Sequence, residues 1–304
     1  MKYTLVFVIS LLSIVTFAQT KPGDSTVSCE AHWVKGEKKI LSIARHKEST
    51  DANKPKPNFD FNYQAHVSVL DSTSAGYTIQ WIFQLPEAVR AQNPELANAL
   101  SVYNGMKMVY KTSVTGEFIE LVNWEEVRDT YVKMMMYSLP DLDSVGEAAV
   151  AKSREMFNSR KVVESSLIKE IHLFHLPYGR KFSTVEKNEP TELENPFSAK
   201  PLPAMEIARL VEMNSEQKYC KLIIQQKIDT AGALAMMEDI LTKMEIDDTD
   251  VLEVKKALSN LEINDTNEYI SIQPSGWMKK VTNTRIVKNG ERRQQESTTI
   301  EMLN

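Results

Sequence analysis

Apolar and polar residues alternate over much of the chain, with the period of two that is typical of strands with one buried face. The clearest case is the pair of segments 63–69 and 77–83, which flank turn-forming residues at 71–76. Asn289-Gly290 predicts a type I′ turn inside a hairpin near the end of the chain. The other predicted strands show the same alternation: 27–34 and 38–46 joined around Gly36, 106–110 followed by a turn at Thr115-Gly116, 205–213, 218–228, 269–272, 277–287 and 291–302.

In other segments the apolar period lengthens to that of a helix. Asn123 and Glu126 have the spacing of a capping box, so a helix is predicted to begin there. A second helix should end at Pro177 and Gly179. The predicted helices are a short one opening at Asn93-Pro94, then 123–139, 163–174, 231–244 and 251–258.

This order of elements predicts the fold class. Strands do not alternate regularly with helices, which argues against a parallel doubly wound sheet and favours α+β. We expect one large curved antiparallel sheet, or two related sheets, half-barrel-like, with the central and C-terminal helices packed on one side. A Pro-containing stretch, 180–203, is predicted to be a linker or crossing segment between a β-rich part, 19–179, and an α+β part, 204–304. The two parts could still form one continuous domain.

The first 18 residues have the layout of a secretory signal peptide. Lys2 precedes an apolar run at 5–17, which is shorter than the roughly 20 residues that span a bilayer. Thr16 and Ala18 are the small residues expected before a cleavage site. The sequence therefore predicts cleavage near Ala18, a periplasmic or secreted protein, and a mature chain without a transmembrane segment.

Composition and motifs exclude several chemistries. The net charge of −5 leaves no basic excess for binding nucleic acid. The glycines form neither a phosphate-binding loop nor a GxSxG nucleophile elbow, so no cofactor and no catalytic residue is assigned. His172 and His175 lack a third metal ligand nearby in the sequence, which favours a packing role and predicts no metal site.

Export would make a disulfide permissible. Cys29 and Cys220 both fall on the apolar side of their predicted strands. Two interpretations remain open at this point: the two cysteines pair with each other, or both are buried, inert thiols.

Methionine is the distinctive residue of the composition, with 14 in all. Flexible thioether side chains suit a cavity that accepts an apolar or variable ligand, although they also fill gaps in ordinary cores. The candidate ligand-lining residues on the predicted helices are Tyr131, Met134, Met135 and Met236.

The chain resembles the uncharacterised secreted proteins, classed as domains of unknown function, of the Bacteroidota. The features that carry the resemblance are Phe17-Ala18-Gln19, Lys35-Gly36-Glu37, the 110–124 hairpin-to-helix passage, the 173–179 helix exit and Ser275-Gly276-Trp277. The resemblance implies an exported protein and implies no site residues. The curved sheet with helices is also similar in outline to lipoprotein-carrier half-barrels, which is an analogy of fold.

These observations favour a non-enzymatic envelope protein that binds an apolar or amphipathic ligand, such as a small molecule or a lipid, between sheet and helices. The first alternative is a structural or interaction module that binds another envelope protein, with the strands at 277–302 offering an edge for strand addition. The second is a hydrolase whose catalytic residues are dispersed along the sequence.

Overall fold

The computed structural model describes residues 25–50, 59–87, 91, 101–138, 151, 154–155, 157–193, 201–228, 230–243, 256 and 260–303. The predicted signal peptide, the helix start at Asn93-Pro94 and nearly all of the 251–258 helix lie outside the described residues. No helix in the described part of the chain is long and apolar enough to cross a membrane.

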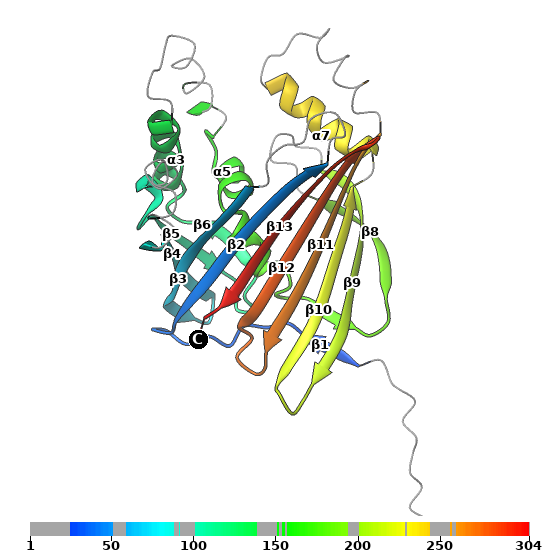
Figure 1. Cartoon of the computed structure of the whole chain (residues 1–304). Helices are drawn as coiled ribbons and strands as arrows, with labels where there is room; N and C mark the ends of the chain where they lie inside the picture. The colour runs from blue at the N-terminus through cyan, green and yellow to red at the C-terminus, as the bar shows by residue number, and fades with distance from the viewer. Residues whose placement is uncertain are drawn as a thin grey trace, which may run out of the picture.

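Within these residues the fold is dominated by one open antiparallel sheet of eleven strands, in the order β6-β5-β4-β3-β2-β13-β12-β11-β10-β9-β8 (Figure 1). The strands are β2 (Lys38–Thr50), β3 (Phe59–Thr73), β4 (Gly76–Gln84), β5 (Lys107–Thr112), β6 (Phe118–Leu121), β8 (Lys187–Leu193), β9 (Leu202–Asn214), β10 (Tyr219–Ile228), β11 (Leu261–Ile272), β12 (Met278–Asn289) and β13 (Arg292–Met302). The sheet has two halves, β2–β6 and β8–β13, which we call its arms, and within each arm neighbouring strands follow one another in sequence. The arms meet where β13 pairs with β2. The prediction of a large antiparallel sheet is confirmed.

The alternating pattern explains which face of this sheet is buried. In β3, Tyr63, Ala65 and Val67 are buried while the residues between them are more exposed. Strand pairing aligns such residues into a row across six strands, all within one hydrophobic core: Leu222, Tyr269, Val281, Ile300, Ile43 and Tyr63. We call the face that carries this row the inner face.

Helices cover the inner face. They are α3 (Trp124–Ser138), α5 (Arg160–Leu167), α6 (Lys169–His175) and α7 (Thr230–Lys243), with a 3-10 turn η1 (Ser101–Tyr103). Val163 of α5 and Phe174 of α6 belong to the same buried cluster as the inner-face row. Helix α7 contacts β9 and β11 instead, near the end of the sheet where Ala204 and Ile263 form a smaller cluster. Two cavities lie between the inner face and these helices.

Residues 25–34 form an N-terminal crossing segment that closes one end of this space. Only Thr26–Ser28 is a strand, β1, and it pairs with β7 (Lys181–Ser183). The prediction that 27–34 pairs with 38–46 is therefore wrong. The reason is that the backbone N–H groups of Cys29, Ala31 and His32 donate to carbonyl oxygens of Arg180, Thr115 and Ser275, which lie in three separate parts of the chain.

Three further predictions are corrected. The strands at 277–302 are central rather than an edge, because β13 lies between β12 and β2. The turn after Asn289 has a positive φ at Gly290 (+60°) but not at Glu291, which is the pattern of type II′ rather than type I′. The Asn123 side chain does not cap the helix as predicted: its oxygen accepts from the Val109 N–H, and its amide donates to Glu126.

The stretch 180–203 contains β7 and the edge strand β8, and residues 194–200 lie outside the described residues. Pro190 is accommodated in β8 because an edge strand can lack one backbone donor. One sheet and one main buried cluster contain residues from both sides of this stretch.

Candidate functional site

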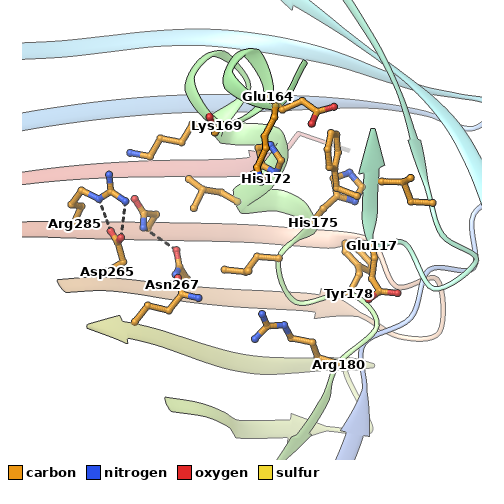
Figure 2. A pocket seen from close by; sticks show the side chains of 18 of the residues that line it. Glu117, Glu164, Lys169, His172, His175, Tyr178, Arg180, Asp265, Asn267 and Arg285 are labelled. Carbon is orange, nitrogen blue, oxygen red and sulfur yellow. Dashed lines mark hydrogen bonds and ion pairs between the residues drawn. The ribbon is translucent and has the colours of Figure 1, made fainter. Parts of the chain in front are cut away.

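Among the described residues, two cavities lie between the inner face and the helices. One is an open, polar cleft between α5, α6 and strands β10–β12, with a volume of about 780 Å³ (Figure 2). The other is a smaller, mainly aromatic pocket of about 220 Å³ between α3, the α5–α6 junction and strands β2–β5. We call them the polar cleft and the aromatic pocket.

Charged residues of both signs line the polar cleft. Arg285 forms a two-point ion pair with Asp265, at 2.8 and 2.7 Å, and Figure 2 shows both side chains on the sheet floor. Arg180 lies 2.7 Å from the Glu206 carboxylate. Each of these two cations is balanced by a carboxylate. The lining also contains the cations Arg160, Lys161 and Lys169 and the carboxylates Glu117 and Glu164.

Two buried amides continue the floor of the cleft. Asn283 and Asn267 are each 1% exposed, and they are paired across β12 and β11. The Asn283 amide donates to the Asn267 side-chain oxygen at 2.8 Å, and the Asn267 amide donates to the Ile224 carbonyl oxygen at 3.3 Å. The Asn283 side-chain oxygen has no hydrogen-bond partner in the described part of the structure. These residues make the cleft a polar surface on a face that is otherwise apolar.

The aromatic pocket has a different character. The Tyr63 and Phe83 rings stack with centroids 4.5 Å apart, and Phe61 stacks on Tyr63 at 5.6 Å. The Tyr103 ring lies 5.9 Å from Phe83 and is tilted by 53° against it. Tyr131 of α3 closes one side. The complete lining is Arg45, Phe61, Tyr63, Trp81, Phe83, Tyr103, Met106, Met108, Val127, Tyr131, Ser166, Leu167, Ile168, Glu170 and Ile171. Rings and thioethers of this kind favour contact with an apolar or aromatic ligand.

A chain of ion pairs separates the two cavities. Arg45 lies 3.6 Å from Glu170 and 3.1 Å from Glu296, and Lys169 lies 3.3 Å from the same Glu296 oxygen. Arg45 and Glu170 line the aromatic pocket, whereas Lys169 lines the polar cleft. Two cations and two carboxylates make the group neutral as a whole. We call these four residues the charged bridge.

Burial and mutual attraction set the titration of the charged bridge. Burial alone would raise the pKa of Glu296, but Lys169 and Arg45 outweigh it and hold that pKa below its usual value. Burial and the neighbouring Arg285 hold the pKa of Lys169 below its usual value, against the pull of Glu296. Burial, followed by the negative charge of Glu170, raises the pKa of the Tyr63 hydroxyl. At neutral pH the carboxylate of Glu296 is therefore ionised and the phenol of Tyr63 is neutral.

The residues predicted to line a ligand site are only partly brought together. Tyr131 lines the aromatic pocket as expected. Met134 and Met135 are half-buried on α3 but are not among the residues described around either cavity. Met236 belongs to α7, and its side chain lies outside the described residues. The methionines that do line the pocket are Met106, which directly precedes β5, and Met108, which lies in β5.

Both candidate histidines lie beside the polar cleft. His175 is buried, with its Nδ1 2.7 Å from the Gly116 carbonyl oxygen and its Nε2 3.0 Å from the Tyr110 hydroxyl. Burial lowers the pKa of His175 to about 4, so the ring is neutral, with Nδ1–H donating to the carbonyl. His172 packs edge-on against Phe118, with ring centroids 4.5 Å apart. The described residues contain no cluster of three His, Cys, Asp or Glu side chains suited to a metal ion.

The two cysteines are free and buried in the structure. Burial, followed by the influence of Cys220, raises the pKa of the Cys29 thiol, and burial also raises the pKa of the Cys220 thiol. Neutral, buried thiols are poor nucleophiles. Whether the two cysteines pair in the oxidised protein stays a prediction.

Sequence reasoning missed the charged residues of both cavities. Asp265 and Asn267 did carry a signal, because they occupy inward positions of an alternating strand where apolar residues are expected. Arg45 and Glu170 carried none, since they meet only when β2 and α6 pack together. No protein-family model matches the chain, and no curated protein matches it either.

Proposed function

We propose that the protein binds a small molecule with an apolar body in the aromatic pocket and acts as an exported, non-enzymatic envelope protein. The observation that carries this proposal is a pocket of about 220 Å³ lined by stacked rings beneath α3 and the α5–α6 junction. The packing of α5 and α6 on the inner face of the open sheet supports the same proposal. The signal-like residues 1–18 support export to the periplasm or the medium.

The volume of the pocket limits the size of its ligand. An apolar cavity of about 150 Å³ is sufficient to bind benzene. A pocket of about 220 Å³ therefore accommodates one substituted ring or a short acyl chain rather than a whole lipid. Burying one ring of about 200 Å² contributes about 5 kcal/mol, which corresponds to a dissociation constant on the order of 0.1 mM.

Two adjacent serines of α5 allow a matched test. Ser166 lines the aromatic pocket and Ser165 lines the polar cleft, and both are exposed. A tryptophan at position 166 should fill the mouth of the pocket, while the same residue at 165 should leave the pocket open. Toluene binding, followed by saturation-transfer NMR, should be lost in Ser166→Trp and kept in Ser165→Trp. Equal binding by both variants would contradict the proposal.

Native mass spectrometry tests for a resident ligand and for export. The protein is recovered from the periplasm of a bacterial host without detergent and is weighed before and after organic extraction. We expect a chain that begins at Gln19, with additional mass that extraction removes and that Ser166→Trp lacks. A chain that keeps its first 18 residues would contradict export.

A further inference from the structure

The lining of the polar cleft contains more cations than carboxylates. Among the described residues around it, five side chains are cationic and three are anionic: Arg160, Lys161, Lys169, Arg180 and Arg285 against Glu117, Glu164 and Asp265. The chain as a whole has the opposite balance, with a net charge of −5. Cations are therefore gathered in this cleft on a protein that is otherwise acidic, and such a local group attracts anions.

The ion pairs of these cations present their positive ends to the cleft. Lys169 is paired with Glu296 at 3.3 Å, and Arg180 is paired with Glu206 at 2.7 Å. Neither carboxylate is among the described residues that line the cleft. A ligand in the cleft would lie nearer to each cation than to the carboxylate behind it, so attraction to the cation is the larger effect on an anion.

Two of the cations have accessible donor groups. The Arg285 side chain is 42% exposed, whereas that of its partner Asp265 is 11% exposed. The pair with Asp265 engages Nε and Nη2 of Arg285, which leaves Nη1 for another partner. The Lys169 side chain is 25% exposed, and its ammonium has three N–H groups, of which one is directed to Glu296. Both residues can therefore donate to a ligand without breaking an ion pair.

Lys169 and Arg285 are close enough to repel one another. Burial is the main cause that lowers the pKa of Lys169, and the positive charge of Arg285 is the next. Figure 2 shows Lys169 of α6 and Arg285 of β12 on one side of the view, with the carboxylates of Glu117 and Glu164 on the opposite side. An anion placed between the two cations would add two attractions that offset this repulsion.

We propose that the polar cleft is a second ligand site, separate from the aromatic pocket, and that it takes a small organic anion whose carboxylate or phosphate group binds between Lys169 and Arg285. The anionic group accepts hydrogen bonds from Lys169 Nζ and Arg285 Nη1. The cleft volume of about 780 Å³ lies within the range of small-molecule sites, about 300–1,000 Å³. The charged bridge separates the two cavities, so this inference goes beyond the proposed function and does not depend on it.

Neutral and cationic ligands match these groups less well. A ligand ammonium would meet two cations. A ligand hydroxyl could accept from Arg285, but both oxygens of the neighbouring Asp265 carboxylate already accept from that residue. An anion needs only donors, and charge-assisted hydrogen bonds are about twice as strong as those between neutral groups.

Four probes test the charge and the chemistry of the ligand by isothermal titration at neutral pH: pyrophosphate, citrate, triethyl citrate and putrescine. We expect pyrophosphate or citrate to bind saturably, and to bind more weakly as NaCl rises from about 20 to about 200 mM. The tighter of these two anions distinguishes a phosphate from a carboxylate ligand. Triethyl citrate, which is neutral, and putrescine, which is cationic, should not bind. Failure of both anions to bind saturably, or equal binding by triethyl citrate, would overturn the inference.

Two adjacent serines provide variants that remove no ion pair. Ser165 lines the polar cleft and Ser166 lines the aromatic pocket, and both are exposed. Glutamate at either position changes the net charge equally. Ser165→Glu should weaken binding of the tighter anion roughly fivefold at low ionic strength, and Ser166→Glu less than about twofold, because the repulsion falls with distance. Equal weakening by both variants would show that the anion responds only to overall charge, which would overturn the inference.

Two paired lysines test the contact directly. Lys169 and Lys221 are each bound to one carboxylate, but Lys221 and its partner Glu268 do not line the cleft. Lys169→Gln keeps a hydrogen-bond donor for Glu296 and should weaken anion binding at least about fivefold, whereas Lys221→Gln should leave it within about twofold. Circular dichroism checks that both variants are folded. If Lys169→Gln is folded and binds the anion as wild type does, the inference is wrong.

Competition tests whether the two sites are separate. Toluene binding should be the same in the presence and absence of a saturating concentration of the tighter anion. Displacement of toluene by the anion would place both ligands in one cavity and would contradict a second site. Loss of toluene binding alone would contradict the proposed function and leave the anion site standing.

Discussion

Acidification should destabilise the protein through His175. This ring is 3% exposed, and its two nitrogens are already engaged by Gly116 and Tyr110. Burial lowers its pKa from 6.5 to about 4, while the hydrogen bond to Gly116 opposes that effect and His172 adds to it. Between these two pH values His175 binds a proton in the unfolded chain but stays neutral in the folded protein. The stability is therefore complete above about pH 6.5 and declines as the pH falls through this window.

The magnitude follows from the two pKa values. Acidification from about pH 7.5 to about pH 5 should lower the free energy of unfolding by about 2 kcal/mol through His175 alone. Urea unfolding followed by circular dichroism at several pH values measures this loss. His175→Asn removes the titration, so its loss over the same interval should be smaller by about 2 kcal/mol. At pH 7.5 the variant should be less stable by roughly 1–3 kcal/mol, because the buried Tyr110 hydroxyl loses its partner.

A second histidine provides a control of opposite sign. The exposed His46 lies 2.6 Å from Asp60, and this hydrogen bond raises its pKa, against a smaller effect of burial. The stability that His46 contributes is present below its unfolded pKa of 6.5 and is lost as the pH rises through the raised value. His46→Gln should therefore steepen the loss on acidification. An identical pH dependence in wild type and His175→Asn would refute the reasoning about His175.

Three further predictions concern other parts of the fold. Cys29 and Cys220 should resist iodoacetamide in the folded protein, because burial raises the pKa of both thiols. Both should react once the protein is unfolded without a reductant, and failure to react under those conditions would show that they are paired. Gly276→Ala should destabilise more than Gly290→Ala in thermal unfolding: both glycines have positive φ, but a Cβ at 276 would lie 2.0 Å from a backbone oxygen of the N-terminal crossing segment, whereas position 290 is open. Burial would raise the pKa of Glu296, but neighbouring cations hold it below its usual value. Wild type should therefore lose stability as the pH falls from about 4.5 through that lowered pKa, and Glu296→Gln should lose less.

The parts of the fold that sequence reasoning predicted correctly depend on local periodicity. The segments 63–69 and 77–83 alternate cleanly, and they form β3 and β4. Residues 27–34 alternate equally well, yet most of them form no strand, because loops distant in sequence take their hydrogen bonds. Alternation reports which side chains are buried, as it does for Trp33, but it does not report which backbone becomes the partner.

The candidate site was less predictable for the same reason. Tyr131 was recognised because it lies on the apolar stripe of a helix. The ion pair between Arg45 and Glu170 joins residues more than a hundred positions apart, and no local pattern marks either of them. Asp265 is intermediate: its inward position was readable in the sequence, but its partner Arg285 is identified only by the register between β11 and β12.

The seam between β2 and β13 has a consequence for how the chain folds. Contacts across it, such as that between Arg45 and Glu296, join residues 251 positions apart, so they form only after most of the chain has been made. Such a high contact order predicts slow folding. Until β13 arrives, the two arms of the sheet each end in a strand with unpaired backbone groups, which can join to other chains. Strand β13, the last strand of the chain's described part, therefore joins the two arms of the sheet. A protein that ends before Arg292 should aggregate rather than fold into two independent halves.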